Sequence, residues 1–321
     1  MDMSELKNIP AGELRGKLTR DEPMARHVSW RAGGTARQAY MPANLDDMAA
    51  FLRGLPGDEP VCMVGLGSNL LVRDGGFEGT VIFTHWALRD LQVSRSGSSV
   101  GEIRAQAGVA CPKVARTAAL NDLAGAEFLA GIPGTIGGAL AMNAGCYGGE
   151  TWNLVAQVET IDRGGMIRVR TPRHYHIAYR SVQARSRQLS SVSGPDFDGG
   201  EEWFVSATLR MKHGDGARSR MEIKSLLSKR IAAQPLGIPN AGSVFRNPHG
   251  DHAARLIEAC GLKGTKIGGA SISVKHANFI VNDGGATATD IEALVELAQS
   301  AVQQRFGIAL EREVRIIGVG A

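Results

Sequence analysis

The sequence predicts an α+β protein with two domains, and three observations support this. The chain has 321 residues, which is about the length of two ordinary domains. Both halves contain helical and strand-like segments, but not the regular strand–helix alternation of a parallel α/β sheet. The polar run 212–216 interrupts the strand pattern of residues 203–211, which indicates a domain boundary. We therefore expect a tail or short helix in residues 1–22, one domain in 23–211 and another in 212–321.

In the first half, the hydrophobic pattern predicts two helices and a series of short strands. Asn44 is placed to cap a helix that carries Phe51 and other apolar residues on one face, and Pro112 fits the first turn of a second helix. Turns at 96–98 and 163–165 predict hairpins. Apolar and alternating runs predict strands in 61–64, 79–84, 91–95, 103–107, 155–161, 166–169 and 203–211.

The second half is predicted to hold three helices and several short strands. Helices are expected over 220–233 and 251–260, followed by a long amphipathic helix. Thr289 is the expected cap of that long helix, and Ile291 and Val302 lie on its buried face. Strands are expected near 244–246, 270–273, 279–281 and 310–317.

Composition and charge exclude several classes of protein. The net charge is only +4, from 36 Lys and Arg and 32 Asp and Glu, so nothing indicates a nucleic-acid partner. The four cysteines are widely spaced without a CxxC pair, which argues against zinc and disulfides and for a reducing cytoplasm. The apolar stretch 128–142 is too short for a membrane helix, and the N-terminus lacks the apolar segment of a signal peptide.

Glycine is unusually abundant, with 41 residues, and two segments concentrate it. Gly65–Leu70 follows a predicted strand and narrowly misses the GxGxxG pattern. Its backbone N–H groups can hold a pyrophosphate, but an ordinary turn explains the segment as well. In Gly131–Gly138, glycines beside small apolar residues let the backbone lie against a large planar ligand, and Thr135 can cap a helix that faces a diphosphate. Tight packing through small residues is the alternative.

Two chemical motifs can be excluded. Residues 97–101 match GxSxG, but both flanks predict strands, whereas a hydrolase nucleophile elbow needs a helix after the serine. His174 and His176 lack a third metal ligand nearby, so we expect no metal site.

Two later segments stay undecided on their spacing alone. Residues 240–248 place Ser243 after a glycine and between two asparagines, which an ordinary turn entering a strand would also do. Residues 310–315 alternate, so that Glu311 and Glu313 share one face of a strand. A solvated edge strand would show the same pattern.

Taken together, these segments resemble the UDP-N-acetylenolpyruvoylglucosamine reductase family, also called UDP-N-acetylmuramate dehydrogenase. The resemblance runs from about His27 to Ile317. A lid insertion found in one subclass is absent, so the chain resembles the shorter subclass. The motifs are specific as an ordered series: WRAGGTA, GLGSNLLVRDGGFEG, FLAGIPGTIGGALAMNAG, AYR, NAGSVFRNP, LIEACGLKG, SVKHANFIVN and LEREVRIIG.

The resemblance implies a p-cresol methylhydroxylase-type FAD-binding fold in 23–211, with subdomains of about 23–90 and 91–211. Residues 212–321 would form a separate substrate-binding domain. FAD would bind without a covalent bond, its pyrophosphate at the first glycine segment and its ring system near the second. The residues implied to bind it are Gly65, Leu66, Gly67, Ser68, Asn69, Leu70, Gly108, Ile132, Pro133, Gly134, Thr135, Gly138, Ala139 and Asn143.

The implied reaction belongs to peptidoglycan precursor synthesis. NADPH would reduce FAD, and the flavin N5 would pass hydride to the enolpyruvyl group of UDP-N-acetylglucosamine-enolpyruvate. The resulting enolate-like species can take a proton from a neutral hydroxyl, the role implied for Ser243. Arg180 would hold the carboxylate, and Glu313, if protonated in a dry site, would hydrogen-bond the enolate. The residues implied to hold the nucleotide sugar are Tyr147, Tyr179, Gln234, Asn247 and Arg315.

The chain departs from the family pattern after Arg180, where Ser-Val-Gln follows, and Arg246 replaces a common Lys. Two alternatives stay open. A flavin oxidase of the same fold would attach FAD covalently, with Cys146 as the candidate residue, and a nucleotide-sugar-binding regulator would have no catalysis. We expect a monomer whose partners are small molecules, without nucleic acid or membrane.

Overall fold

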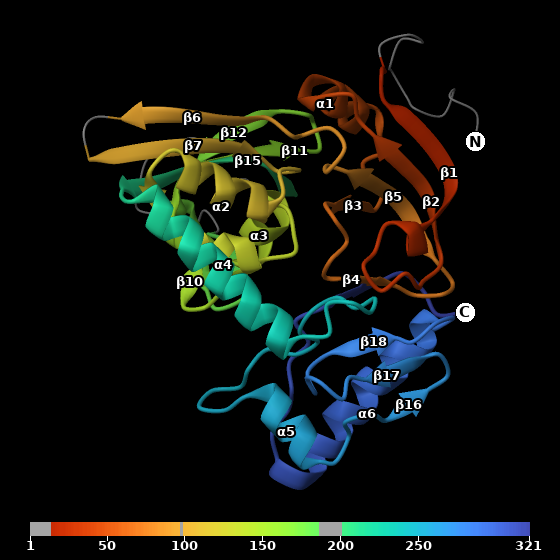
Figure 1. Cartoon of the computed structure of the whole chain (residues 1–321). Helices are drawn as coiled ribbons and strands as arrows, with labels where there is room; N and C mark the ends of the chain where they lie inside the picture. Colours follow the sequence, from red (N-terminus) through yellow and green to blue (C-terminus); the bar gives the residue numbers. More distant parts are fainter. Residues whose placement is uncertain (1–13, 97–98, 186–200) are drawn as a thin grey trace. The chain divides into compact units, whose positions relative to one another are not determined.

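The computed structural model describes residues 14–96, 99–185 and 201–321, which form two compact units (Figure 1). Unit 1 comprises the described parts of Met1–Leu18, Tyr40–Gly65 and Val81–Leu227, and unit 2 those of Thr19–Ala39, Leu66–Thr80 and Ser228–Ala321. The two units are therefore interleaved along the chain. Strands β1 (Lys17–Pro23), β2 (Thr35–Met41) and β5 (Phe77–Phe83) and helix α4 (Gly216–Ala233) each begin in one unit and end in the other.

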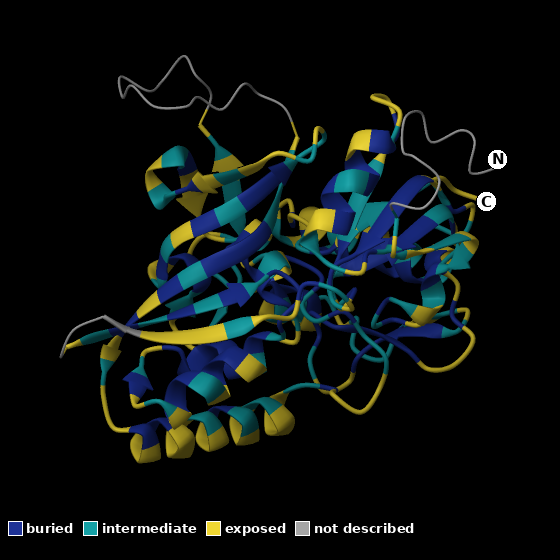
Figure 2. Ribbon diagram, turned by 90° about the horizontal axis from the view of Figure 1, so that it is seen from above, coloured by how far each residue is buried: buried dark blue, intermediate teal, exposed yellow. Residues whose placement is uncertain are grey.

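Unit 1 is built on a six-stranded antiparallel sheet. Helices α2 (Cys111–Leu120) and α3 (Ile136–Met142) pack on it, as Figure 1 shows. Buried residues alternate with half-buried ones along strand β7 (Val100–Gln106), which is typical of a strand with one face on a core (Figure 2). The strand order is β12 (Ile167–Arg170), β11 (Val155–Asp162), β15 (Glu202–His213), β7 (Val100–Gln106) and β6 (Leu91–Ser96), and β8 (Leu123–Ala124) also pairs with β15.

Short elements complete unit 1. Asn44 caps helix α1 (Leu45–Gly54) by accepting a hydrogen bond from the N–H of Asp47. Strand β3 (Val61–Val64) pairs with β5 at the edge of a four-stranded sheet with the order β1-β2-β5-β3. The elements are α1 (Leu45–Gly54), β3 (Val61–Val64), β9 (Gly145–Cys146), β10 (Gly149–Glu150), β13 (Tyr175–Ala178), β14 (Ser181–Ala184) and the 3-10 helices η3 (Glu127–Gly131), η4 (Thr151–Asn153) and η5 (Pro172–His174).

Unit 2 combines the C-terminal residues with two earlier segments. The indole N–H of Trp30 donates to the carbonyl of Ile280 at 2.7 Å, and Asn282 Nδ2 donates to the carbonyl of Trp30 at 2.9 Å, so the WRAGG segment lies in the C-terminal core. The elements are η2 (Met24–Arg26), the parallel pair β4 (Leu70–Val72) and β19 (Arg315–Ile317), α5 (Ala253–Ala259), the antiparallel strands β16 (Lys266–Ile267), β17 (Ala270–Ile272) and β18 (Ile280–Asn282), and α6 (Ala288–Phe306).

The expected α+β class, the helix capped by Asn44 and the two hairpins of unit 1 are confirmed. The turn expected at 96–98 includes residues 97 and 98, which lie outside the described residues. The expected tail also lies partly outside them, but strand β1 already begins at Lys17. Strand β15 continues to His213, beyond the break expected at 212.

Several expected elements of unit 2 begin or end elsewhere. Helix α6 is capped by Thr287, not Thr289, because Thr287 and Asp290 form a reciprocal capping box. The strand expected at 244–246 is a single bridge between Phe245 and Arg312. The closing strand shortens to Arg315–Ile317, because residues before it turn toward that bridge.

Candidate active site

Close contacts explain both glycines of the first glycine segment. A Cβ atom at Gly65 would lie 2.3 Å from Oγ1 of Thr135, a residue of the second glycine segment. Gly67 has a φ of +59°, and a Cβ atom there would lie 2.0 Å from the carbonyl oxygen of His27. Side chains are therefore excluded at both positions, at Gly67 by backbone conformation as well.

The second glycine segment lies along residues 107–111 of unit 1. Cys111 N–H donates to the carbonyl of Gly134 at 2.9 Å, and Ile136 N–H donates to that of Val109 at 2.8 Å. This brings Gly108 close to the residues predicted to bind FAD between Ile132 and Ala139. Thr135 is the N-cap residue of α3, but its side chain makes no capping hydrogen bond, contrary to the prediction.

Gly138 differs from Gly131 and Gly137 of this segment in its surroundings. It is exposed, and within 4 Å a Cβ atom would meet only Thr135 Oγ1, at 3.9 Å. The backbone at Gly138 therefore presents an open face without side chains. Such a face fits the close approach of a flat, phosphate-bearing cofactor, and the glycine segments suit FAD in this respect.

Asn143 has a mainly structural set of contacts. It is fully buried, and its Nδ2 donates to Glu150 Oε2 at 2.9 Å and to the carbonyl of Ala178 at 3.1 Å. Its Oδ1 accepts from the N–H of Trp152 at 3.2 Å. These bonds tie the end of α3 to β10 and to the hairpin β13–β14. Asn143 thus holds the hairpin that carries the next predicted residues.

Arg180 lies at the tip of this hairpin, a pairing that the sequence analysis did not expect. Its guanidinium donates to the carbonyl of Gly145 at 2.7 Å and to that of Asn143 at 3.4 Å, and it lies 5.2 Å from the ring centre of Tyr179. The side chain is therefore fixed on one side by carbonyl groups. Tyr147 lies in the same unit, and its hydroxyl donates to the carbonyl of Leu226 at 3.1 Å.

Backbone strain is concentrated at these residues. Six non-glycine residues in the described ranges have a positive φ, and three of them are Asn143, Tyr147 and Arg180. Each such conformation costs about 1–3 kcal/mol, and it persists only where the surrounding structure holds it. The strain is consistent with a site in this part of unit 1.

In unit 2, the structure brings Ser243 and Glu313 into adjacent segments. Glu313 N–H donates to the carbonyl of Val244 at 2.8 Å, and Arg246 N–H donates to that of Glu311 at 2.9 Å. The carboxylate of Glu311 forms an ion pair with Arg246, and the Glu311 side chain is strongly exposed. Neither glutamate lies within a regular strand, so the expected shared strand face is not formed.

The first glycine segment joins this group through Asn69. Its Nδ2 donates to the carbonyl of Glu313 at 3.0 Å, and its own carbonyl accepts from the N–H of Arg315 at 3.0 Å. Arg315 also pairs with Leu70 across β19 and β4. Within unit 2, the residues predicted for pyrophosphate binding and for catalysis therefore lie on neighbouring segments.

Two other predicted residues make local contacts. Asn247 Oδ1 accepts from Ala253 N–H at 3.1 Å, at the start of α5, and Gln234 Oε1 accepts from Arg230 Nε at 3.0 Å. The structure thus gives both side chains a local role. Their predicted contact with the nucleotide sugar stays a prediction.

The Arg-Asp pair of the LVRDGG motif has a structural role that could not be predicted from the sequence. Arg73 makes a two-point ion pair with Glu292 of α6, at 2.7 and 2.8 Å. Asp74 accepts hydrogen bonds at the start of α6 from the N–H groups of Ala288 and Thr289 and from the Thr289 hydroxyl. Burial opposes ionisation of Asp74, but these hydrogen bonds outweigh it and lower its pKa. The motif thus anchors the first glycine segment to α6.

The cysteines bear on the alternative with covalent FAD. Cys146 Sγ lies 3.0 Å from the carbonyl of Phe128, to which it donates a hydrogen bond. Burial raises the pKa of the Cys111 thiol to about 12, so this thiol is inert near neutral pH. In the part of the chain that the structure describes, no three His, Cys, Asp or Glu side chains are grouped to hold a metal ion.

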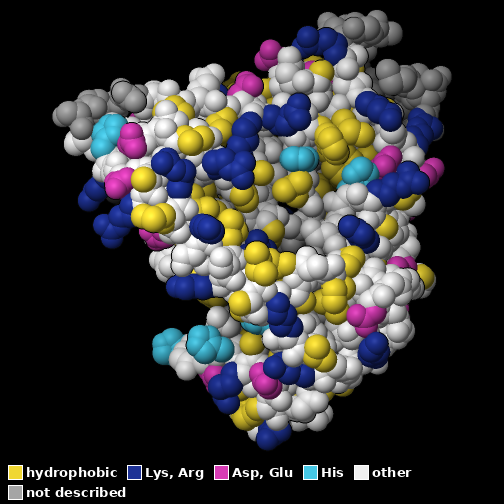
Figure 3. Space-filling model, in the orientation of Figure 1, with side chains coloured by type: hydrophobic (Ala, Val, Ile, Leu, Met, Phe, Trp, Pro, Cys, Tyr) yellow, Lys and Arg dark blue, Asp and Glu magenta, His cyan; other side chains and the backbone are white. Residues whose placement is uncertain are grey.

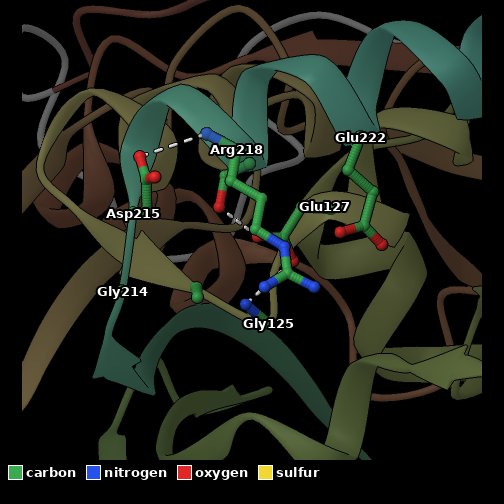
Figure 4. A pocket seen from close by; sticks show the side chains of 8 residues that line it. Gly125, Glu127, Gly214, Asp215, Arg218 and Glu222 are labelled. Carbon is green, nitrogen blue, oxygen red and sulfur yellow. Dashed lines mark hydrogen bonds between the residues drawn. The ribbon is translucent and has the colours of Figure 1, made fainter.

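A separate cavity of about 290 Å³ lies in unit 1 at the start of α4 (Figure 4). Glu127 and Asp215 line it, but both carboxylates accept hydrogen bonds from neighbouring residues. The lining contains none of the residues predicted for the site. We assign it no function.

On the face drawn in Figure 3, Lys and Arg side chains are spread over the surface among hydrophobic and a smaller number of acidic ones. Across the described ranges, no helix is both long and apolar enough to cross a bilayer.

Comparisons with known proteins agree with this arrangement. A family model named FAD binding domain matches residues 36–170, and one named UDP-N-acetylenolpyruvoylglucosamine reductase, C-terminal domain, matches residues 234–317. The chain is 54% identical to proteins named UDP-N-acetylenolpyruvoylglucosamine reductase from Nitrosospira multiformis, covering 100% of this chain and 94% of that protein, and from Thiobacillus denitrificans, covering 99% and 97%. The crystal structure of the reductase from Thermus caldophilus matches with a TM-score of 0.73 and 28% identity, over 94% of this chain and 99% of that one. The predicted FAD-binding fold with a C-terminal domain is confirmed.

Proposed function

This chain belongs to the UDP-N-acetylenolpyruvoylglucosamine reductase family, and we propose that it reduces UDP-N-acetylglucosamine-enolpyruvate to UDP-N-acetylmuramate with NADPH as reductant. The observation that carries this proposal is the 54% identity over essentially the full length of relatives with that reductase name. The product would enter peptidoglycan precursor synthesis and so support cell wall biogenesis, cell shape and cell division. We propose a monomer that acts in the cytoplasm.

FAD is the proposed cofactor, in line with the matched FAD-binding domain. Bound FAD supplies two-electron redox chemistry between NADPH and the substrate. The two glycine segments and Gly108 would hold it, since the open backbone face at Gly138 fits a flat ligand. Asn69 would contribute through its place in the first glycine segment, next to the Glu313 backbone.

Ser243 is the proposed proton donor. Hydride addition to an enolpyruvyl double bond leaves charge delocalised into the carboxylate, and that species is basic enough to take a hydroxyl proton. The segment that follows Ser243 is fixed by the hydrogen bond between Val244 and Glu313. This hydrogen bond holds the backbone next to Ser243 in place, which favours proton transfer because the hydroxyl must be well positioned.

Arg180 and Glu313 are proposed to stabilise the same charge. Two carbonyl groups hold the Arg180 guanidinium, which limits its motion and favours a charge-assisted bond to the substrate carboxylate. Glu313, when protonated, would donate a hydrogen bond to the enolate, which strengthens as the charge develops. Tyr147, Tyr179, Gln234, Asn247 and Arg315 are proposed to hold the nucleotide sugar.

The test is to follow the flavin absorbance of the purified protein under anaerobic conditions. NADPH should bleach the yellow flavin, and the enolpyruvyl substrate should restore its colour. A flavin that NADPH does not bleach would favour the binding regulator. A flavin that stays with the protein after acid precipitation would favour the covalent oxidase.

A further inference from the structure

We propose that Asn278 is a positioning residue that fixes the backbone carrying Ser243 for proton transfer. The proposal rests on the proposed role of Ser243 and adds a residue that carries no role so far. Asn278 lies in unit 2, just before β18, and only 3% of its surface is exposed. A buried amide needs hydrogen-bond partners, and its partners are informative here.

The side-chain amide of Asn278 makes a two-point contact with the backbone of a single residue. Its Oδ1 accepts from Phe245 N–H at 2.9 Å, and its Nδ2 donates to the Phe245 carbonyl at 2.8 Å. In addition, the main-chain carbonyl of Asn278 accepts from Val244 N–H at 2.9 Å. The two residues that follow Ser243 are therefore held by one buried asparagine.

The same backbone is held from a second direction by the Glu313 segment. The carbonyl of Val244 accepts from Glu313 N–H at 2.8 Å and from Val314 N–H at 3.3 Å. Val244 thus has its N–H bound to the Asn278 main chain and its carbonyl bound to the Glu313 segment. Asn278 completes a set of bonds that fixes Ser243 relative to Glu313.

The chemistry of this contact requires an amide. Only a side chain with one donor and one acceptor in a plane matches the N–H and carbonyl of one residue. Asn278→Asp keeps the size but replaces the donor by a second acceptor, which faces the Phe245 carbonyl. Asn278→Ala removes both partners and leaves the two buried backbone groups of Phe245 without their hydrogen bonds.

The expected effect falls on one half-reaction. A displacement of about 1 Å at a reacting group can cost on the order of 10²-fold in rate. We expect Asn278→Ala and Asn278→Asp to slow reoxidation of reduced flavin by the enolpyruvyl substrate about 10- to 100-fold. Reduction of the flavin by NADPH should change by less than about twofold, because no proton from Ser243 is needed there.

Asn282 provides a matched control. It is also a buried asparagine in unit 2, 7% exposed, and its amide binds the backbone of Trp30, Gly284 and Ala286. None of these side-chain contacts involves the segment of Ser243. Asn282→Ala should therefore lower thermal stability without changing the ratio of the two half-reaction rates.

A double variant separates positioning from general destabilisation. If Asn278 acts through Ser243, adding Asn278→Ala to Ser243→Ala should slow reoxidation by less than about twofold beyond Ser243→Ala alone. If the slowing factors of the two single variants multiply in the double variant, the proposal is overturned. Equal slowing of both half-reactions by Asn278→Ala would also overturn it. If Asn278→Ala does not fold, the isosteric Asn278→Asp variant is measured with the same criteria.

Hydrogen exchange gives a readout that does not depend on activity. In the purified wild-type protein, the amides of Val244 and Phe245 should be protected, and Asn278→Asp should increase exchange there more than elsewhere in unit 2. Unchanged exchange with unchanged reoxidation would overturn the proposal. If Ser243→Ala itself leaves the reoxidation rate unchanged, the proposed role of Ser243 fails. If Ser243→Ala slows reoxidation but Asn278→Ala does not, only the proposed role of Asn278 is rejected.

Discussion

The backbone of the first glycine segment and that of the two segments carrying Ser243 and Glu313 are held in place in different ways. At Gly65 and Gly67 of the first glycine segment, neighbouring atoms occupy the space that a side chain would need. Around Ser243 and Glu313, hydrogen bonds from other segments fix the backbone and leave side chains to do chemistry. A substitution in the first region should therefore damage structure or cofactor binding, whereas one in the second should damage a single chemical step.

The largest effect is expected at Gly67. Gly67→Ala places a Cβ atom against the His27 carbonyl in a conformation that L-residues avoid. We expect a loss of about 3 kcal/mol or more in the free energy of unfolding, with little flavin retained. Urea unfolding and the flavin-to-protein absorbance ratio measure this. Near-normal stability would show that the segment shifts easily.

Glu313 should give the next largest effect, limited to reoxidation of the flavin. Removing a preorganised donor costs about 3 kcal/mol, or on the order of 10²-fold in rate. We expect the order wild type, then Glu313→Gln, then Glu313→Ala in the reoxidation rate. The exposed Glu311 is the control, and Glu311→Ala should change the rate by less than about twofold. Equal small effects at both positions would remove Glu313 from the mechanism.

Gly138 tests whether its open face meets the cofactor. Gly138→Ala should leave thermal stability almost unchanged, since a Cβ atom there meets almost no protein atoms. FAD affinity should fall about 10-fold, or about 1.4 kcal/mol, when measured by titration of the apoprotein. Gly57, which is exposed and equally unobstructed, is the control, and Gly57→Ala should not change FAD affinity. Equal affinities in both variants would contradict the assignment.

The smallest effect is expected at Asp74, which links the chain after the first glycine segment to the start of α6. Asp74→Ala should lower the free energy of unfolding by about 1 kcal/mol near pH 6, the usual loss when a side chain that accepts hydrogen bonds at a helix N-terminus is removed. Because the folded pKa of Asp74 is lowered, its contribution is present above the ordinary pKa of about 4 and is lost as the pH falls through the lowered value. Urea unfolding should therefore show a smaller difference near pH 3. Exposed Asp58→Ala should show no comparable loss at either pH.

The sequence predicted local features well where a residue type demands them. Asn44 caps α1 as expected, because asparagine at that position binds the N–H three residues later. The cap of α6 was wrong by two residues, since Thr287 and Thr289 are both suitable and only Asp290 decides between them. The hairpin that carries Arg180 was missed because its turn contains neither glycine nor asparagine.

The sequence supplied candidate site residues but not their geometry. Ser243 and Glu313 became candidates through the resemblance to a family, because the spacing of their own segments left them undecided. Their adjacency depends on hydrogen bonds between segments far apart in the chain. Asn278 lies in the SVKHANFIVN motif, but nothing in the local sequence shows that its amide binds Phe245. The interleaved units likewise depend on distant contacts such as that of Trp30 with Ile280.

The most direct test of the account is the ratio of the two half-reactions in Ser243→Ala. We expect NADPH to reduce the bound flavin at nearly the wild-type rate, while the enolpyruvyl substrate reoxidises it at least about 10²-fold more slowly. Ser243→Cys should recover part of the lost rate, since a thiol can also donate a proton. Equal slowing of both half-reactions, or unchanged reoxidation, would contradict the assignment of Ser243 as the proton donor.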